Sequence, residues 1–343
     1  MDGQTKQHLS LFRKRPTLLS VAALWIGLGW SASCSKDPPA TPPLGDNFGA
    51  TAAPTAGDYR YPFDTVPSSD GSILYFTATS ASKGTLGIFS VPSMGGTATS
   101  LFVGAPLVDP HGLAISSDDK TLFIADGAAG YDPTNAMGTN DLGGVYSMST
   151  SGGTPTLVAG TAGLRPRGVD VAKEDSGDVV YFTGQTTSDG KATVFKMSAS
   201  GGNVSTVFSG APLTDVSGIA VSHSGVIYVA NVSGASGSTS ATIFQIQNGA
   251  VSEVVSGILV GNPAGISLSQ DDRTLLVSGQ DRVLGTSVVH RVNLETKAIT
   301  QYNQGLENSP DSGGLHRARN ADVFGWAGVT VGDRGTVFRV EFK

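Results

Sequence analysis

An internal repeat is the feature that most constrains the fold. The segment GAPLVDPHGLAIS at 104–116 returns, little changed, as GAPLTDVSGIAVS at 210–222. Weaker copies also occur, and all copies can be aligned on one position, which we call the phase position. It is occupied by Asp64, Gly112, Gly168, Gly218, Gly265 and Gly314. Successive phase positions are 48, 56, 50, 47 and 49 residues apart. Self-similarity at a fixed period indicates an array of equivalent structural units.

Each copy continues with three further apolar segments. In the first copy these are ILYFTA at 73–78, GIFSVP at 87–92 and TSLFVG at 99–104. Turn sequences such as SSDDKT and SGG separate the segments, as antiparallel hairpins require. Four strands in about 50 residues match one propeller blade. We therefore predict an all-β fold: a six-bladed β-propeller of four-stranded antiparallel blades over residues 59–343.

The last copy ends at Lys343 without a fourth strand. A closed ring leaves no sheet edge unpaired, so another segment must complete this blade. We expect the missing outer strand to come from the N-terminal side, within residues 47–59.

Composition agrees with a β-fold and excludes one class of partner. Charged residues make up only 15% of the chain and Gly accounts for 46 of 343 residues, which argues against long solvated helices. The net charge is -6, and no block of Lys or Arg follows residue 15. A nucleic acid partner is not expected, because its phosphates would find no basic surface.

The N-terminus has the order of an export signal. Arg13–Arg15 precede an apolar stretch at 17–30, which is shorter than the roughly 20 residues of a membrane-spanning helix. Cys34, the single cysteine, follows Ser31–Ser33, and this arrangement resembles a bacterial lipoprotein signal. We predict a signal peptide at 1–33, a lipidated Cys34 with a Pro-rich tether at 34–58, and a protein anchored in the cell envelope. The alternative is ordinary cleavage after Ser33, which yields a secreted or periplasmic soluble protein.

The pattern P-x-G-[LIV]-A-[VIL]-S, followed by an Asp-rich turn and an aromatic strand, resembles the six-bladed propellers of the NHL-repeat and senescence-marker-protein/gluconolactonase groups. The resemblance covers essentially all of residues 59–343. It implies that the residue before each phase position points into the central channel, which here selects Phe63, His111, Arg167, Ser217, Ala264 and Gly313. Strand alternation adds the residues two positions earlier, Tyr61, Asp109, Arg165, Asp215, Asn262 and Asp311.

These positions predict one polar cluster at a channel mouth, composed of Asp109, His111, Arg165, Arg167, Asp215, Asn262 and Asp311. The guanidinium groups of the Arg residues can donate paired hydrogen bonds to an anionic or polyhydroxylated ligand, and the Asp carboxylates can accept hydrogen bonds from its hydroxyl groups. The first hypothesis is a protein that binds a small molecule or a protein partner there, without catalysis. The second is a propeller hydrolase or lyase in which Asp109, His111, Arg167 and Asp215 act and His111 carries a proton. The third possibility is that Asp and Arg pair around a wet channel and do no chemistry.

The resembling lactonases hold a divalent cation with Glu, Asn and Asp at such positions. This sequence departs from that pattern, because no Glu occupies a channel position and Arg165 and Arg167 would repel a cation. Zinc is also disfavoured, since His111 is the one His in a clear channel position and His316 is a remote second. We therefore predict no metal and no cofactor, with a divalent cation as the alternative.

Two further groups of acidic residues have local interpretations. The pairs at 118/119 and 271/272 lie in predicted hairpin turns, where Asp caps its own backbone in preference to binding calcium. The longest insertion, 126–143, carries Asp132, Asn135 and Asp141, which could form a lip over a ligand.

Overall fold

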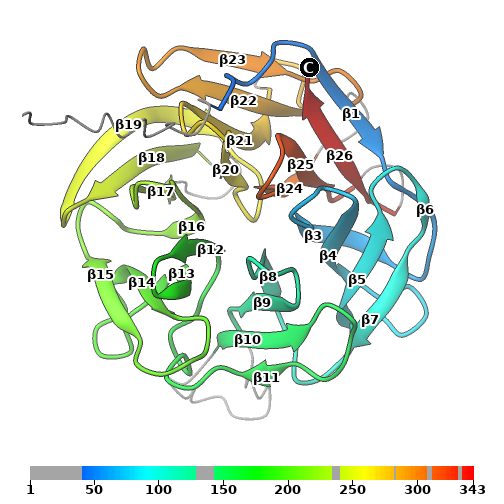
Figure 1. Ribbon diagram of the computed structural model, residues 1–343, viewed down its shortest axis with the longest axis horizontal. Helices are drawn as coiled ribbons and strands as arrows, with labels where there is room; N and C mark the ends of the chain where they lie inside the picture. Colours follow the sequence, from blue (N-terminus) through cyan, green and yellow to red (C-terminus); the bar gives the residue numbers. More distant parts are fainter. Residues whose placement is uncertain (1–40, 129–142, 234–239, 282, 307–310, 331–333) are drawn as a thin grey trace, which may run out of the picture. The chain divides into compact units, whose positions relative to one another are not determined.

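The computed structural model describes residues 41–128, 143–233, 240–281, 283–306, 311–330 and 334–343. Within these ranges every regular element is a β-strand, and six four-stranded antiparallel sheets stand around a central axis (Figure 1). The predicted all-β, six-bladed propeller is confirmed. No helix in the described part of the chain has the length and apolar character needed to cross a membrane. The predicted signal peptide and Cys34 lie outside the described residues.

The blades follow the repeat copies in order. Blade 1 contains β3 (Arg60–Pro67), β4 (Ile73–Thr79), β5 (Leu86–Pro92) and β7 (Thr99–Val103), and blade 2 contains β8 (Pro110–Ile115), β9 (Thr121–Asp126), β10 (Gly144–Ser149) and β11 (Thr156–Leu157). Blade 3 contains β12 (Val169–Glu174), β13 (Gly177–Gln185), β14 (Ala192–Ser198) and β15 (Ser205–Ser209), and blade 4 contains β16 (Val216–Val221), β17 (Ile227–Ser233), β18 (Ser240–Gln247) and β19 (Ala250–Leu259). Blade 5 contains β20 (Ile266–Leu268), β21 (Thr274–Gln280), β22 (Ser287–Asn293) and β23 (Ile299–Tyr302). Blade 6 contains β24 (Ser312–Arg317), β25 (Val323–Gly328) and β26 (Thr336–Phe342).

The outer strand of blade 6 comes from the other end of the chain. Strand β1 (Phe48–Ala52) pairs antiparallel with β26, from Phe48 opposite Phe342 to Ala52 opposite Phe338 (Figure 1). It lies within the predicted window of 47–59, and so the predicted closure is confirmed. A short parallel pairing of β2 (Pro54–Ala56) with β6 (Gly96–Thr97) follows it, which the sequence did not predict.

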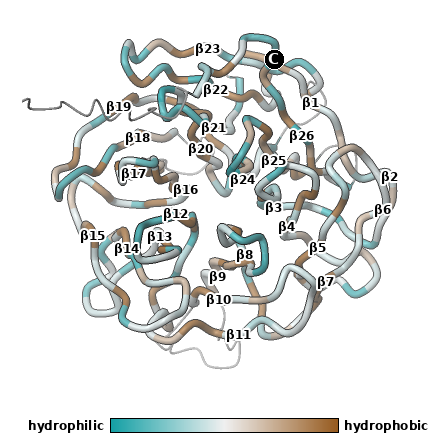
Figure 2. Tube along the Cα trace, in the orientation of Figure 1, coloured by the Kyte–Doolittle hydropathy of each residue, from teal (hydrophilic) through white to brown (hydrophobic). Residues whose placement is uncertain are grey.

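Apolar side chains fill the spaces between neighbouring blades. One cluster joins Val66 and Ile88 of blade 1 to Leu113 and Ile124 of blade 2. Figure 2 shows hydrophobic positions recurring along the strands of every blade, while several connecting loops are hydrophilic. Each blade therefore buries its faces only against its two neighbours, as in other repeat architectures.

The phase glycines are required by the close approach of the inner strands. A Cβ atom on Gly112 would lie 2.3 Å from the carbonyl oxygen of Arg167, and one on Gly218 would lie 2.0 Å from that of Ala264. Real Cβ atoms do not approach backbone oxygens so closely, so the strands could not pack this way with any side chain at these positions. The recurrent Gly thus marks where one blade touches the next beside the channel.

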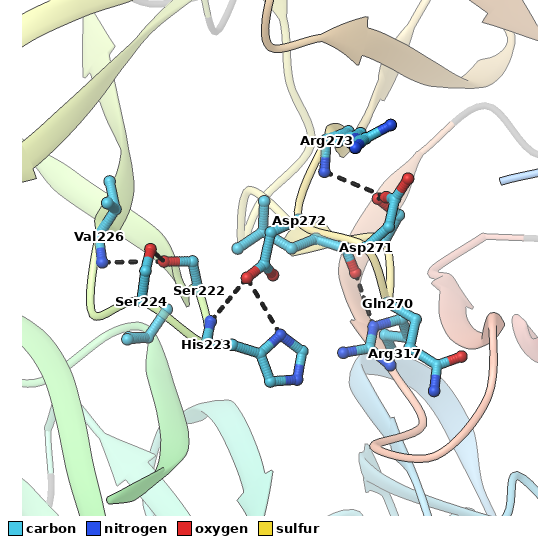
Figure 3. A network of polar contacts seen from close by, with 12 residues as sticks. Ser222, His223, Ser224, Val226, Gln270, Asp271, Asp272, Arg273 and Arg317 are labelled. Carbon is cyan, nitrogen blue, oxygen red and sulfur yellow. Dashed lines mark hydrogen bonds and ion pairs between the residues drawn. The ribbon is translucent and has the colours of Figure 1, made fainter. Parts of the chain in front are cut away.

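Aspartates in the first hairpin turns link the blades. Asp119 accepts a hydrogen bond from the Ser69 amide at 2.9 Å, and Asp272 accepts one from the His223 amide at 2.8 Å (Figure 3). The predicted local capping holds for the first member of each pair: Asp118 accepts from the Lys120 amide, and Asp271 from the Arg273 amide. The second member, Asp119 or Asp272, instead reaches the preceding blade, because the turn carries it across the interface.

Candidate functional site

One mouth of the channel is a cavity of about 190 Å³ that we call the His111 mouth. Its lining includes five of the seven residues predicted to bind a ligand, together with Gln185 and several small residues; the five are Asp109, His111, Arg165, Arg167 and Asp215. They come from the segments that precede β8, β12 and β16, and from the start of β8. Neighbouring segments of blades 2, 3 and 4 therefore bring these five side chains to one cavity.

The same pattern of hydrogen bonds positions Asp109 in blade 2 and Asp215 in blade 4. The Asp126 carboxylate, at the end of β9, accepts hydrogen bonds from the amides of Val108 (2.8 Å) and Asp109 (3.1 Å). Asn231, at the matching position of β17, accepts from the amides of Thr214 (2.7 Å) and Asp215 (3.1 Å) with its Oδ1. These bonds hold the loops that precede β8 and β16 against their own blades.

Two ion pairs stand at the His111 mouth. Asp109 Oδ1 lies 3.0 Å from Nε2 of His111, and Asp215 Oδ1 lies 2.5 Å from Nη1 of Arg167. The Phe63 ring packs 5.9 Å from the His111 ring. With Nε2 donating to Asp109, the neutral imidazole has Nδ1 as its acceptor, and no described residue hydrogen-bonds to Nδ1. The arrangement is an Asp-oriented histidine with one ring nitrogen available.

Arg165 has an unusual backbone and an uncommitted side chain. Its φ is 45°, a left-handed conformation that is uncommon outside glycine, and Tyr61 at the matching position of blade 1 has φ of 52°. The side chain is exposed, and among the described residues nothing hydrogen-bonds to its guanidinium or forms an ion pair with it. Strand alternation does not explain its placement, because β12 begins only at Val169. Arg165 and Arg167 reach the cavity from the segment that leads into this strand.

The two remaining predicted residues do not line the His111 mouth. Asn262 donates its amide to the Ser312 carbonyl at 3.1 Å, and Asp311 accepts a hydrogen bond from the Thr330 hydroxyl at 2.9 Å. Asp311 is thus tied to the segment after β25. The predicted lip residues Asp132, Asn135 and Asp141 lie outside the described residues.

A buried ion pair deeper in the channel escaped the sequence prediction of the site. His316 Nε2 lies 3.1 Å from Asp64 Oδ2, and the Asp64 carboxylate also accepts hydrogen bonds from the Thr65 and Leu113 amides. A narrow part of the channel is lined by Asp64 and His316 together with His111 and Arg167. The signal for this pair was the one charged residue at a phase position, Asp64; His316 lies two residues after Gly314 on β24, the inner strand of blade 6.

The pKa of His316 reflects two opposing effects. Burial lowers the pKa. The charge of Asp64, the hydrogen bond to Asp64 and the charge of Asp170 raise it by more than burial lowers it, so the net shift is upward. The channel therefore stabilises the imidazolium form of His316 relative to an imidazole in water.

The donors present do not fit the divalent cation that the resemblance implies. Among the residues that the structure describes, no group of three or more His, Cys, Asp or Glu side chains is placed to hold a metal ion. At the His111 mouth, one carboxylate is engaged by His111 and the other by Arg167. A hard cation requires several free oxygen ligands, which these two engaged carboxylates do not supply.

Comparison with known proteins supports the fold. No protein-family model matches the sequence, and no curated protein matches it. Among solved structures, the PQQ-bound aldose sugar dehydrogenase from Streptomyces coelicolor is 15% identical with a TM-score of 0.60, covering 88% of this chain and 99% of its own. A gluconolactonase from Xanthomonas campestris is 14% identical with a TM-score of 0.55, covering 89% and 99%. AofleA from Arthrobotrys oligospora is 10% identical with a TM-score of 0.55, covering 86% of each chain.

The class of protein follows from these observations. The chain is a six-bladed β-propeller with gluconolactonase-like and dehydrogenase structures among its neighbours. At such low identity the similarity establishes architecture and leaves the chemistry to the residues of this chain.

Proposed function

We propose that the protein is an enzyme of the propeller hydrolase or lyase class that acts on a small, anionic or polyhydroxylated molecule at the His111 mouth. The observation that carries the proposal is the Asp109–His111 pair beside the uncommitted guanidinium of Arg165. The names of two structural neighbours, an aldose sugar dehydrogenase and a gluconolactonase, support a sugar-related substrate.

Each residue has a defined role in this proposal. Arg165 binds an anionic or carbonyl oxygen of the substrate with its forked donors. His111 accepts a proton at Nδ1 from water or from the substrate, and Asp109 stabilises the imidazolium that forms. The Arg167–Asp215 pair offers a donor and an acceptor to substrate hydroxyl groups.

A binding protein without catalysis is the second candidate. It is favoured by the donor set, since the described residues lack the cluster of oxygen ligands on which the resembling lactonases depend. In that case the same five residues recognise the ligand, and His111 serves as a hydrogen-bonding group.

The decisive experiment compares the purified protein with His111→Gln and Arg165→Gln variants on a panel of aldonolactones, measuring turnover by proton release and affinity by calorimetry. We expect His111→Gln to lower kcat by at least about a hundredfold, since proton transfer by a positioned residue contributes that much. We expect Arg165→Gln to weaken binding by about tenfold, through the loss of a charged hydrogen bond. Arg60→Gln is the matched control, because Arg60 donates to the Ala81 carbonyl on blade 1 and does not line the mouth.

The results separate the two candidates. Unchanged turnover in His111→Gln excludes His111 as the proton acceptor, and the absence of turnover in the wild type counts against the enzyme proposal. Binding that is lost in Arg165→Gln, with no turnover of any lactone by the wild type, favours the second candidate.

Cofactor binding is tested by equilibrium dialysis of the protein against PQQ. PQQ carries carboxylate groups, so Arg165 and Arg167 are the residues of this mouth that would hold it. When bound, PQQ would accept electrons from a sugar.

Lipidation of Cys34, anchorage to a membrane and location in the cell envelope stay predictions from sequence.

A further inference from the structure

The far end of the channel forms a second cavity, of about 110 Å³, that we call the far cavity. Residues after the phase position in all six blades line it, so it lies beyond the Asp64–His316 pair as seen from the His111 mouth. Its ionisable lining residues are Asp170, Lys173, His223, His316, Arg317 and Arg319. Five of these six side chains are basic.

The acidic groups near the far cavity are already engaged. Asp170 accepts hydrogen bonds from the amides of Val171 and Val221, each at 2.8 Å, one with each carboxylate oxygen. The acids that pair with His223, Lys173 and His316 do not line the cavity; they are Asp272, Asp178 and Asp64. Figure 3 shows Asp272 bonded to His223 beside Arg317. Basic side chains therefore outnumber acidic ones among the residues that line the cavity.

Arg319 has one buried donor atom, Nε, that lacks an acceptor. Its Nη2 donates to the Val171 carbonyl at 3.1 Å, which links blade 6 to blade 3 across the ring. Its backbone carbonyl accepts from Nη1 of Arg317 at 3.0 Å, so the segment that carries it is held in place. Its Nε is buried and has no hydrogen-bond partner among the described residues. A buried charged donor without an acceptor is costly, and in native proteins such donors usually have one.

We propose that the far cavity binds a small oxyanion, such as phosphate, sulfate or a carboxylate group, with Arg319 as its principal donor. A planar guanidinium matches two oxygens of such an anion, and the basic side chain of Arg317 lines the same cavity. The cavity volume suits a small anion. The site is distinct from the His111 mouth and does not depend on the proposed reaction.

The experiment titrates the purified full-length protein with inorganic phosphate, sulfate and acetate by calorimetry at constant ionic strength, with chloride as the balancing anion. We expect one equivalent of at least one oxyanion to bind, and Arg319→Gln to weaken that binding by about tenfold or more. Arg319→Lys, which keeps the charge but loses the fork, is expected to bind with intermediate affinity.

Two further variants serve as controls. Arg60→Gln should bind the anion as the wild type does, because Arg60 donates to the Ala81 carbonyl and lines neither cavity. Arg339→Gln tests whether the loss of any arginine with an unpartnered Nε weakens binding. Arg339 also has a buried unpartnered Nε but lies outside the cavity, so this variant should bind the anion as the wild type does. Thermal melts establish that each variant is folded. The proposal is overturned if none of the three anions binds, or if a folded Arg319→Gln variant binds as tightly as the wild type.

Discussion

At the scale of single residues, Asp64 shows how a departure from a repeat becomes informative. Five phase positions are Gly, whereas blade 1 has Asp, whose carboxylate bonds to its own blade, to Leu113 of blade 2 and to His316 of blade 6. A Cβ on Gly314 would lie 1.7 Å from Asp64 Oδ1, so the glycine opposite makes room for this carboxylate. One side chain therefore joins three blades at the place where the ring closes.

The Asp64–His316 pair predicts a pH-dependent stability. Since the pKa of His316 is raised in the fold above its ordinary value of 6.5, the imidazolium stabilises the native state fully below that value. The contribution is lost as the pH rises through the raised pKa of the folded protein. Free energies of unfolding measured from pH 6 to pH 9 should fall more steeply for the wild type than for His316→Gln.

His290 is the control for this measurement. Burial lowers its pKa, so the contribution of His290 to stability is fully present above pH 6.5 and is lost as the pH falls through the lowered pKa of the folded protein. The alkaline loss of stability should therefore persist in His290→Gln. If it also persists unchanged in His316→Gln, the ion pair is not its source.

At the scale of strands, the inner strands are held side by side by backbone contact and by hydroxyl groups. Thr183 donates its hydroxyl to the Ser217 carbonyl at 2.5 Å, and Ser278 donates to the Gly313 carbonyl at 2.6 Å, each across a blade interface. The phase glycines permit this approach, since any side chain there would strike the next blade. The strands consequently place the residues before them in a narrow ring.

The phase glycine of blade 4 provides a direct test. Gly218→Ala introduces a Cβ at 2.0 Å from the Ala264 carbonyl oxygen, and the resulting displacement should lower the free energy of unfolding by about 3 kcal/mol or more. Gly49→Ala, on β1, is the matched control, because its Cβ meets nothing within 4 Å and should change stability by less than about 0.5 kcal/mol. Denaturant titrations decide between them, and equal stability of the two variants would contradict the packing argument.

At the scale of the propeller, closure depends on a segment distant in sequence. Arg291 of blade 5 donates to the Leu44 and Gly45 carbonyls, each at 2.9 Å, and pairs with Asp46. Phe48 then packs against Tyr302 and Phe342, with ring centres 5.4 and 5.3 Å away. These contacts with blade 5 hold the N-terminal segment beside the edge of β26, where β1 pairs.

Removal of this segment should destabilise the whole ring. A chain that begins at residue 53 lacks β1 and leaves β26 as an exposed edge, whereas a chain that begins at residue 41 retains it. We expect the shorter chain to lose at least about 3 to 5 kcal/mol, the usual cost of deleting one buried aromatic side chain, and to aggregate. Calorimetric melts and size-exclusion chromatography measure both effects. An unchanged Tm in the shorter chain would show that the ring closes without β1.

Part of this architecture was predictable from local information. The repeat spacing, the turn residues and the apolar segments are properties of consecutive residues, and they predicted six blades and a closing strand within 47–59. The convergence of Asp109, His111, Arg165, Arg167 and Asp215 also followed from the repeat register. Strand alternation was the wrong reason for Arg165, because Arg165 precedes its strand.

The remaining features depend on contacts between residues far apart in the chain. The Asp64–His316 pair, the link from Arg319 to Val171 and the clasp of Arg291 on residues 44–46 each join positions separated by more than 140 residues. A repeating sequence pattern does not identify such partners, because it indicates which face of a strand a side chain occupies and not which residue lies opposite that side chain. Local pattern was enough for the number of blades and their order, whereas the charges that meet inside the channel follow from how the closed ring brings the blades together.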